Sequence, residues 1–215
     1  MSEFVAYGAG VGSTALLYLK KKSIQAGEVE VVYSDHGCDL PESREYIKKI
    51  SDSMDIDITC INAGNLYDYC WQKRLLPSIH WRWCTDKFKI RPMRKHVDGD
   101  IPAIGITLDE KRRAFDFRFS GKSKFPLLDH RITRNQALDM IEADKPCKSG
   151  CFFCPFQNKE QWRSLYQNHK DLFIKAMALE DHARARNPKI YLYKNLLRNL
   201  QREFDTQSTL PEVIP

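Results

Sequence analysis

Strand-like and helix-like segments alternate through the first half of the chain. The strand-like segments are apolar and mostly β-branched or aromatic, and the segments between them carry helical periodicity. The strand-like segments are residues 3–7, 28–34, 56–61 and 101–106, and the helix-like segments are 13–23 and 41–54. Because strands joined through helices pair in parallel, the pattern predicts an α/β fold with a doubly wound parallel sheet.

From about residue 107 the alternation fades. Residues 115–120 (FDFRFS) fit either a strand or an extended loop, residues 133–144 fit a helix, and the pattern is helical from 158 to about 202. The sequence therefore predicts an α/β domain over residues 1–130. It also predicts a helical region with a cysteine-rich loop over 131–205, and a weakly ordered tail over 206–215.

A glycine-rich stretch, GAGVGS (8–13), separates the first strand-like segment from the first helix. It does not place a third glycine at the position that the dinucleotide-binding fingerprint requires, and it lacks the GK[ST] ending of a Walker A loop. Two interpretations remain, a tight turn or a loop whose bare backbone closes around a phosphate at a helix N-terminus. In the second, the contacts come from Gly8, Gly10, Gly12, Ser13 and Thr14.

Asp35 follows the second strand-like segment, at the same carboxyl edge as the glycine loop. Its carboxylate can hold a ribose, a base or Mg²⁺, or can simply cap a turn before Gly37. A basic stretch, residues 81–97, carries Lys89 and can neutralise phosphate charge. Alternatively, it is an exposed helix face interrupted by Pro92.

Seven cysteines are present, and an odd number argues against a disulfide framework. Three of them form C-x3-C-x2-C in PCKSGCFFCPF (146–156), a spacing suited to one soft metal centre. The predicted metal ligands are Cys84, Cys147, Cys151 and Cys154. A [4Fe–4S] cluster and a tetrahedral Zn²⁺ both suit four thiolates, and the Cys-Pro ending favours the cluster. The remaining three, Cys38, Cys60 and Cys70, are predicted to be buried apolar residues.

In this order, the motifs resemble the PP-loop superfamily, the adenine nucleotide α-hydrolases, and within it the branch similar to PAPS reductases. GAGVGS stands in the place of the family loop SGGxDS, and DHG (35–37) with PES (41–43) resembles the D-T-G and P-E-[ST] elements. GITLDEKRR (105–113) resembles the G-x-R…E…R element, with a threonine where arginine is common. The family's loop aspartate is replaced by Gly12, so binding of a nucleotide is better supported than its hydrolysis.

The resemblance implies an ATP pyrophosphatase or sulfurtransferase-type enzyme that cleaves ATP to AMP and pyrophosphate and adenylates an acceptor, with Mg²⁺ offsetting the phosphate charge. It implies catalytic roles for Asp35, Lys89 and Arg113 and a [4Fe–4S] cluster, with sulfur transfer to tRNA or DNA as the outcome. One alternative is a sulfonucleotide (PAPS or APS) reductase, which is disfavoured because no cysteine follows Cys154. The other is a nucleotide-binding, metal-stabilised subunit without catalysis.

The bulk composition constrains partners only loosely. A net charge of +6 permits a polyanionic partner, and no apolar stretch approaches the length of a membrane span. Without a recognisable secretion signal at the N-terminus, a cytoplasmic location is expected. A homo-oligomer or a sulfur-donor protein is compatible with the sequence.

Overall fold

The computed structural model describes residues 3–97, 101–115, 123–146 and 150–208, and the chain divides into two compact units. The sheet unit consists of residues 1–64 and 85–150, and the helical unit consists of residues 65–84 and 151–215. The predicted domain boundary near residue 130 stays a prediction. The compact units group the chain differently, because residues 65–84 pack with the C-terminal helices.

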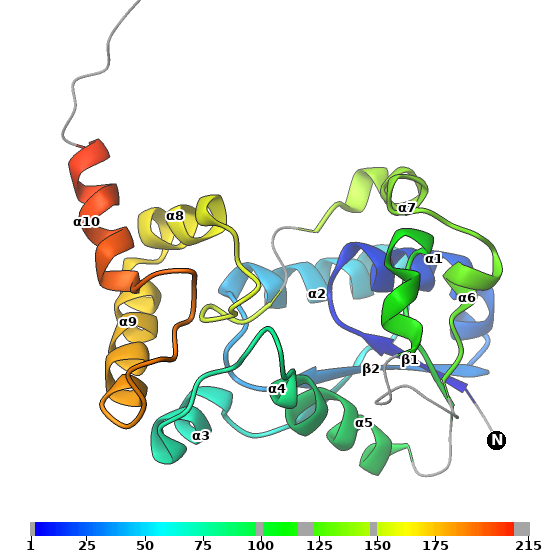
Figure 1. Ribbon diagram of the computed structural model, residues 1–215. Helices are drawn as coiled ribbons and strands as arrows, with labels where there is room; N and C mark the ends of the chain where they lie inside the picture. The colour runs from blue at the N-terminus through cyan, green and yellow to red at the C-terminus, as the bar shows by residue number, and fades with distance from the viewer. Residues whose placement is uncertain (1–2, 98–100, 116–122, 147–149, 209–215) are drawn as a thin grey trace, which may run out of the picture. The chain divides into compact units, whose positions relative to one another are not determined.

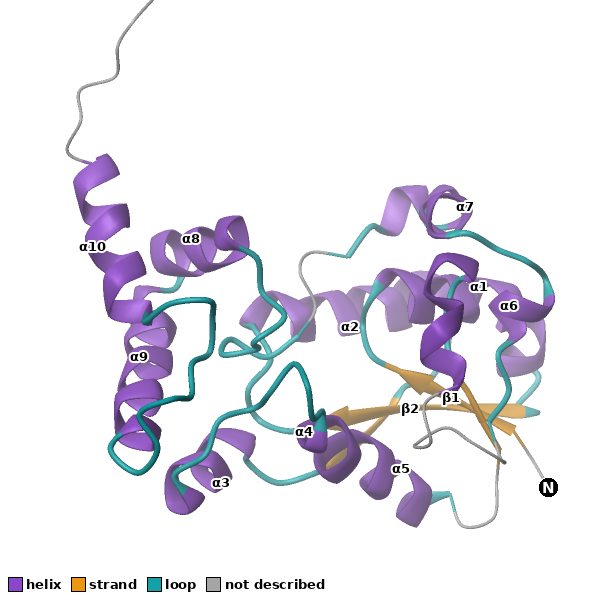
Figure 2. Cartoon of the chain, in the orientation of Figure 1, coloured by secondary structure: helices purple, strands orange, loops and turns teal. Residues whose placement is uncertain are grey.

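A parallel four-stranded sheet forms the centre of the sheet unit (Figures 1 and 2). Its strands are β1 (Glu3–Tyr7), β2 (Val29–Asp35), β3 (Thr59–Asn62) and β4 (Ile101–Ala103). Their order across the sheet is β3-β2-β1-β4, with Glu3 of β1 in register with both Val29 of β2 and Ile101 of β4. The predicted α/β fold with a parallel sheet is confirmed.

Helices cover both faces of this sheet, as the alternating side chains of β1 require. Val5 and Tyr7 pack in one core with α1 (Val11–Gln25) and α2 (Pro41–Met54), whereas Phe4 packs on the opposite face with Met93 of α5 (Arg91–His96). Figure 1 shows α1 and α2 on one side of the sheet and α5 on the other. The remaining elements of this unit are η1 (Asp86–Ile90), η2 (Leu108–Phe115), α6 (Pro126–Asp129), α7 (Arg134–Met140) and η3 (Glu142–Asp144).

Pro92 does not interrupt the helix that contains it. Helical backbone runs without a break through α4 (Trp83–Thr85), η1 and α5, and η1 is a π-helical turn. Pro92 has no N–H for the Phe88 carbonyl four residues earlier. The buried Ser34 hydroxyl at the end of β2 donates to that carbonyl instead, at 2.8 Å. This side-chain bond attaches the helix to the carboxyl edge of the sheet.

The helical unit is built around α9 (Lys170–Arg184), which contacts α3 (Leu66–Lys73), α8 (Lys159–Asn168) and α10 (Leu197–Ser208). Its core contains the fully buried Trp162 and Phe173, whose rings meet edge to face with centroids 6.2 Å apart. Glu180 of α9 is also fully buried, and its carboxylate accepts hydrogen bonds from the backbone N–H groups of Leu192 and Leu197 at 2.9 and 2.8 Å. The predicted helical C-terminal portion is confirmed.

Three predicted segments differ in detail. The strand predicted over 101–106 ends at Ala103, because Ile104 donates its N–H to the Lys124 carbonyl and Ile106 turns back onto Ile104. Helix α10 continues to Ser208, into the segment expected to be a tail. Of the predicted segment 115–120, only its first residue lies within the described residues. Among the described residues, no helix has the length and apolar character needed to cross a membrane.

Candidate nucleotide and metal sites

The glycine loop is closed by the side chain of Ser13. Its hydroxyl accepts hydrogen bonds from the backbone N–H groups of Gly8 and Gly10 at 3.2 and 3.1 Å and donates to the Gly10 carbonyl at 3.0 Å. Ala9, between them, has a left-handed backbone with φ +52°. The loop is therefore a defined turn between β1 and α1, held by its own serine.

The first turn of α1 presents backbone donors at the carboxyl edge of the sheet. Helix α1 begins at Val11 after the N-cap Gly10, and its first turn contains no acidic side chain. The first N–H groups of a helix have no intrahelical acceptor, and the helix dipole favours an anion beside them. The loop thus has the features of a phosphate site, made from backbone rather than from side chains.

Thr14 has a structural role at this helix start. Its side chain is fully buried, with its hydroxyl 3.0 Å from that of Tyr46, and its backbone N–H donates to the Gly10 carbonyl at 2.9 Å. Both polar groups are therefore engaged inside the unit. Of the predicted loop contacts, Thr14 is the one whose hydroxyl points into the core.

Gly12 lies against the backbone of Gly105. A Cβ atom on Gly12 would fall 2.2 Å from the Gly105 carbonyl oxygen, and one on Gly105 would fall 2.4 Å from the Gly12 carbonyl. Real side chains do not approach a backbone so closely, so this packing requires glycine at both positions. The absence of an aspartate at position 12 therefore fits the packing, because the segment after β4 fills the space that a side chain there would enter.

Asp35 caps the turn that follows β2. One carboxylate oxygen accepts the Gly37 N–H at 2.7 Å, and the other accepts a hydrogen bond from Arg44 of α2 at 2.9 Å. The turn-capping interpretation of this residue is therefore present in the structure. The same carboxylate also lines a groove of about 350 Å³ between α2 and the strands β2 and β3, together with Tyr33 and Cys60.

The three isolated cysteines do not behave alike. Cys38 and Cys70 are buried, as predicted, but Cys60 is exposed, so the prediction for it is wrong. Cys60 belongs to the edge strand β3 and lines the groove beside α2. Partial burial and the nearby Asp35 raise the pKa of the Cys60 thiol above its ordinary value.

A buried polar cluster that the sequence did not reveal is formed by residues on both sides of Asp35 in the chain. The Tyr33 hydroxyl donates to the Asp39 carboxylate, and Nε2 of His36 lies 3.4 Å from that carboxylate. Burial lowers the pKa of His36, and the charge of Lys89 lowers it further. Burial alone would raise the pKa of Asp39, but Lys89, His36 and the Tyr33 hydroxyl together hold it below its usual value. The available signal was the acid four residues after Asp35 in DHGCD.

The predicted basic residues have different surroundings. Lys89, on η1, contributes its charge to the buried pair of His36 and Asp39. Arg113, on η2, forms an ion pair with Glu110 at 2.7 Å on the surface. The structure therefore brings Lys89 to the carboxyl edge of β2 and gives Arg113 a local acidic partner.

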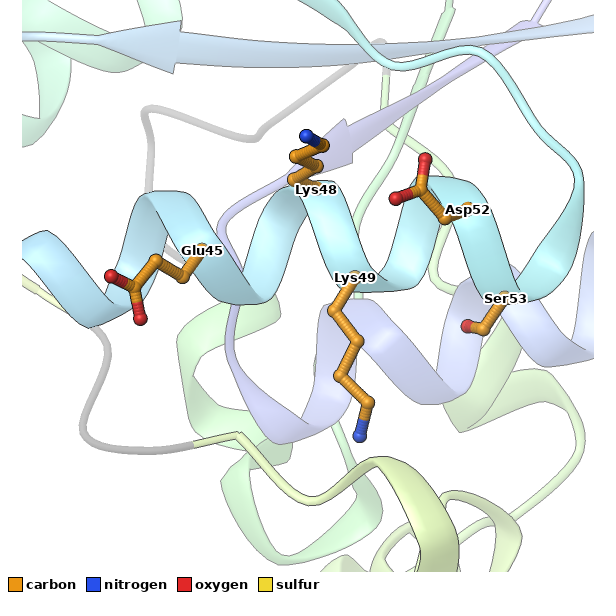
Figure 3. Close-up of a pocket in the computed structure, with 5 residues that line it drawn as sticks. All are labelled: Glu45, Lys48, Lys49, Asp52 and Ser53. Atoms are coloured by element: carbon orange, nitrogen blue, oxygen red, sulfur yellow. The ribbon is translucent and has the colours of Figure 1, made fainter.

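A second hollow, of about 570 Å³, lies on α2 itself. Its lining comes from this helix alone, and Figure 3 shows Lys48 and Lys49 pointing in opposite directions from it. Lys49 is also paired with Asp144 at 3.0 Å. A hollow lined by one exposed helix face lacks the convergent polar groups of a ligand site.

The described metal-ligand candidates all belong to the helical unit. Cys151 is buried, Cys84 and Cys154 are partly buried, and Cys147 lies outside the described residues. The guanidinium of Arg82 lies 5.0 Å from the centre of the Phe156 ring, which joins the segment before Cys84 to the segment after Cys154. Among the described residues, no group of three or more His, Cys, Asp or Glu side chains is placed to hold a metal ion. The donor types suit a soft metal, but the described thiols do not form a ready-made cage.

Comparison with known proteins gives relatives of little-known activity. An uncharacterized protein of Methanocaldococcus jannaschii, MJ0973, is 24% identical over 189 residues, covering 79% of this chain and 45% of its own length. An uncharacterized nin region protein of Escherichia phage lambda, ORF290, is 24% identical over 146 residues, covering 53% of this chain and 50% of its own length. The chain thus spans about half the length of these relatives.

A solved structure also aligns with most of the chain. It is that of the U34-tRNA thiolase NcsA from Methanococcus maripaludis with its [4Fe-4S] cluster, at 16% identity and a TM-score of 0.46, covering 98% of this chain and 73% of that one. The model of the phosphoadenosine phosphosulfate reductase domain matches residues 2–126, more than half of the chain, from β1 through η2. The match includes the glycine loop and Asp35, and the chain belongs to the phosphoadenosine phosphosulfate reductase domain family.

Proposed function

We propose that the sheet unit binds ATP, with the phosphates at the glycine loop and the N-terminus of α1. The observation that carries this proposal is the loop closed by Ser13, which leaves the first N–H groups of α1 directed to the carboxyl edge of β1. Gly8 and Gly10 add backbone without side chains, so a phosphate can approach closely. Membership in the family agrees with a nucleotide ligand.

The proposed reaction is cleavage of ATP to AMP and pyrophosphate, which adenylates an acceptor. Adenylation turns an acceptor oxygen into a good leaving group, and a second nucleophile such as sulfur then displaces AMP. Asp35 is proposed to contact the nucleotide or Mg²⁺ after release from Arg44, and Lys89 and Arg113 to stabilise the negative charge. A nucleic acid, tRNA or DNA, is the proposed acceptor, in agreement with the net charge of +6.

The cysteines are proposed to hold a [4Fe–4S] cluster, through Cys84, Cys147, Cys151 and Cys154. Four thiolates fit this cluster by donor chemistry, and the three described thiols all belong to one unit. When all four ligands are thiolates, such a cluster supplies a structural or redox-sensing centre. Zn²⁺ is the alternative occupant of the same ligands.

Metal content tests the cysteine site directly. Protein purified without oxygen is expected to contain iron and sulfide and to absorb near ~400 nm. Cys154→Ser is expected to lose most of this iron. Cys60→Ser, which removes an exposed thiol of the sheet unit, is expected to keep it. Stoichiometric zinc in a colourless protein would replace the cluster by a zinc site.

ATP binding and pyrophosphate release test the nucleotide site. Calorimetry with ATP is expected to show binding that Ser13→Ala weakens about 2- to 12-fold, the equivalent of roughly 0.5–1.5 kcal/mol for lost, partly buried hydrogen bonds that hold the loop. Ser53→Ala on α2, whose hydroxyl donates to the Ile50 carbonyl in its own helix, is the matched control. Equal affinity of wild type and Ser13→Ala would contradict the phosphate assignment.

A second candidate function is nucleotide binding without hydrolysis, and the contact between Gly12 and Gly105 favours it. That contact leaves no space for a carboxylate at position 12. The two candidates differ in one measurement, since only the first predicts pyrophosphate release in the presence of a nucleic-acid acceptor. Tight ATP binding without pyrophosphate release, across RNA and DNA acceptors, would select the second.

A further inference from the structure

The positive charge of the chain is concentrated in the helical unit. This unit contains 13 lysines and arginines and 8 aspartates and glutamates, whereas the larger sheet unit contains 21 and 20. Almost all of the net charge of +6 therefore belongs to residues 65–84 and 151–215. Such an asymmetry is an electrostatic signature of contact with a polyanion.

Large apolar side chains are exposed in the same unit around the cysteine segments. The Trp81 side chain is 70% exposed, Phe156 is 54% exposed and Ile79 is 52% exposed. The guanidinium of Arg82 lies over the Phe156 ring, which joins the two segments that carry these residues. Together Ile79, Trp81, Arg82 and Phe156 are called here the aromatic surface.

The backbone that carries Trp81 is anchored on both sides of this residue. Nε1 of Trp83 donates to the Leu76 carbonyl at 3.3 Å, and the Trp83 ring packs 5.6 Å from that of Tyr69 on α3. The Trp83 N–H also donates to the Trp81 carbonyl at 2.9 Å. Trp83 thus faces the helical unit, while its neighbour Trp81 remains accessible to solvent. An exposed indole on an anchored segment costs little to order when a ligand stacks on it.

We propose that the aromatic surface binds single-stranded nucleic acid, with unstacked bases packing against Trp81 and Phe156 and the phosphates facing the basic helical unit. Aromatic rings set among cations are the usual means of binding single strands. A duplex fits poorly, because its base faces are already covered by their neighbours. A purely apolar partner would gain nothing from the surplus of lysine and arginine in this unit.

This inference rests on the proposed nucleic-acid acceptor and deepens it, since it names single strands as the substrate class and locates their contact. It depends on no step of ATP cleavage. Binding of an oligonucleotide without ATP therefore tests it separately. Pyrophosphate release can be absent even if this surface binds single strands, and the surface can fail to bind them even if ATP is cleaved.

Fluorescence anisotropy with labelled single-stranded RNA and DNA oligonucleotides of ~20 nucleotides, using the full chain without ATP, is the test. Trp81→Ala and Phe156→Ala are each expected to raise Kd about 5- to 150-fold, which corresponds to roughly 1–3 kcal/mol per stacked base. Trp81→Tyr, which keeps an aromatic face, is expected to recover most of the affinity. The matched control is Phe115→Ala, which removes an aromatic side chain that is 85% exposed in the sheet unit.

Several outcomes would overturn the inference. These are Kd values of Trp81→Ala and Phe156→Ala within twofold of wild type, equal affinity for the single strand and its duplex, and no binding even at low salt. Sedimentation velocity adds one more, since a dimer of wild type that Trp81→Ala dissociates would identify the surface as a contact between two copies. Circular dichroism of each variant is expected to match wild type, because the substituted side chains are exposed.

Discussion

The hydrogen bond from Ser34 to the Phe88 carbonyl is expected to be a major attachment between β2 and the helix that begins at Trp83. We predict that Ser34→Ala destabilises the sheet unit by about 1–3 kcal/mol, the cost of removing a partner from a buried hydrogen bond. The bond is 2.8 Å long and buried, and Ser34 is only 2% exposed, so water does not readily replace the hydroxyl. Ser53→Ala, with its weaker 3.3 Å bond inside α2, is expected to cost less than about 0.5 kcal/mol.

The physical reason for this bond predicts how the substitution depends on Pro92. If Ser34 compensates for the N–H that proline lacks, Pro92→Ala supplies a backbone donor to the same Phe88 carbonyl. Ser34→Ala is then expected to cost at least ~1 kcal/mol less in the Pro92→Ala background than in wild type. A double-mutant cycle isolates this coupling, because the direct cost of Pro92→Ala cancels.

The assay must follow the sheet unit rather than the whole chain. All four tryptophans, at positions 71, 81, 83 and 162, belong to the helical unit, so their fluorescence reports on that unit. Hydrogen exchange of the amides of β1 and β2 reports on the sheet unit alone, whereas far-ultraviolet circular dichroism follows the helices of both units. A coupling below ~0.3–0.5 kcal/mol would refute the reasoning, since Ser34 and Pro92 would then act independently.

Three further predictions follow from the same contacts. Gly12→Ala is expected to lower the free energy of unfolding in urea by at least ~1–3 kcal/mol, because its Cβ would meet the Gly105 carbonyl oxygen. Gly8→Ala should be tolerated, because the nearest atom to its Cβ would be 4.0 Å away. Equal effects of the two substitutions would contradict the close packing of Gly12 on Gly105. The folded state lowers the pKa of His36, so the unfolded chain binds more protons below pH 6.5. The free energy of unfolding should therefore fall as the pH is lowered from 7.5 to 5.5, and it should fall less in His36→Asn. Parallel pH profiles of the two proteins would exclude His36 as the cause. Glu180→Gln presents an amide N–H₂ to one of the two buried N–H groups that Glu180 accepts, and it should destabilise the helical unit by ~1–3 kcal/mol in unfolding followed by tryptophan fluorescence. The control Glu160→Gln, at an exposed side chain, should have little effect. Similar effects of the two substitutions would show that the paired N–H groups are not the reason.

The fold was predictable because its signals are local. Periodicity in the first 61 residues placed three strands and two helices within a few residues of their observed ends, since buried parallel strands are apolar throughout and amphipathic helices repeat apolar residues every three or four positions. The assembly of residues 65–84 with the C-terminal helices was not predictable in this way, because it depends on contacts such as that of His182 with the Trp71 carbonyl, 111 positions apart. Neither residue differs from an ordinary surface side chain in the sequence.

The candidate sites were predictable to different degrees. The glycine loop was located by residue type, and its place between β1 and α1 followed from the fold. The cluster of Tyr33, His36 and Asp39 was missed, because His36 and Asp39 have ordinary exposed roles in a turn after a strand, and only the tertiary structure buries them with Tyr33. Cys60 was assigned to the interior by residue type, but an edge strand exposes alternate side chains.

Nucleotide binding and hydrolysis place different demands on this carboxyl edge. The proposed binding needs backbone donors at the start of α1, since the N–H groups of Gly8 and Gly10 already donate to the Ser13 hydroxyl that closes the loop. Hydrolysis needs a carboxylate for Mg²⁺, but position 12 is closed by Gly105 and Asp35 is already engaged by Gly37 and Arg44. A metal contact at Asp35 therefore requires the Arg44 ion pair to open, with the arginine free to turn to phosphate. The proposed phosphate binding needs no such change, whereas the proposed catalysis requires this rearrangement in α2.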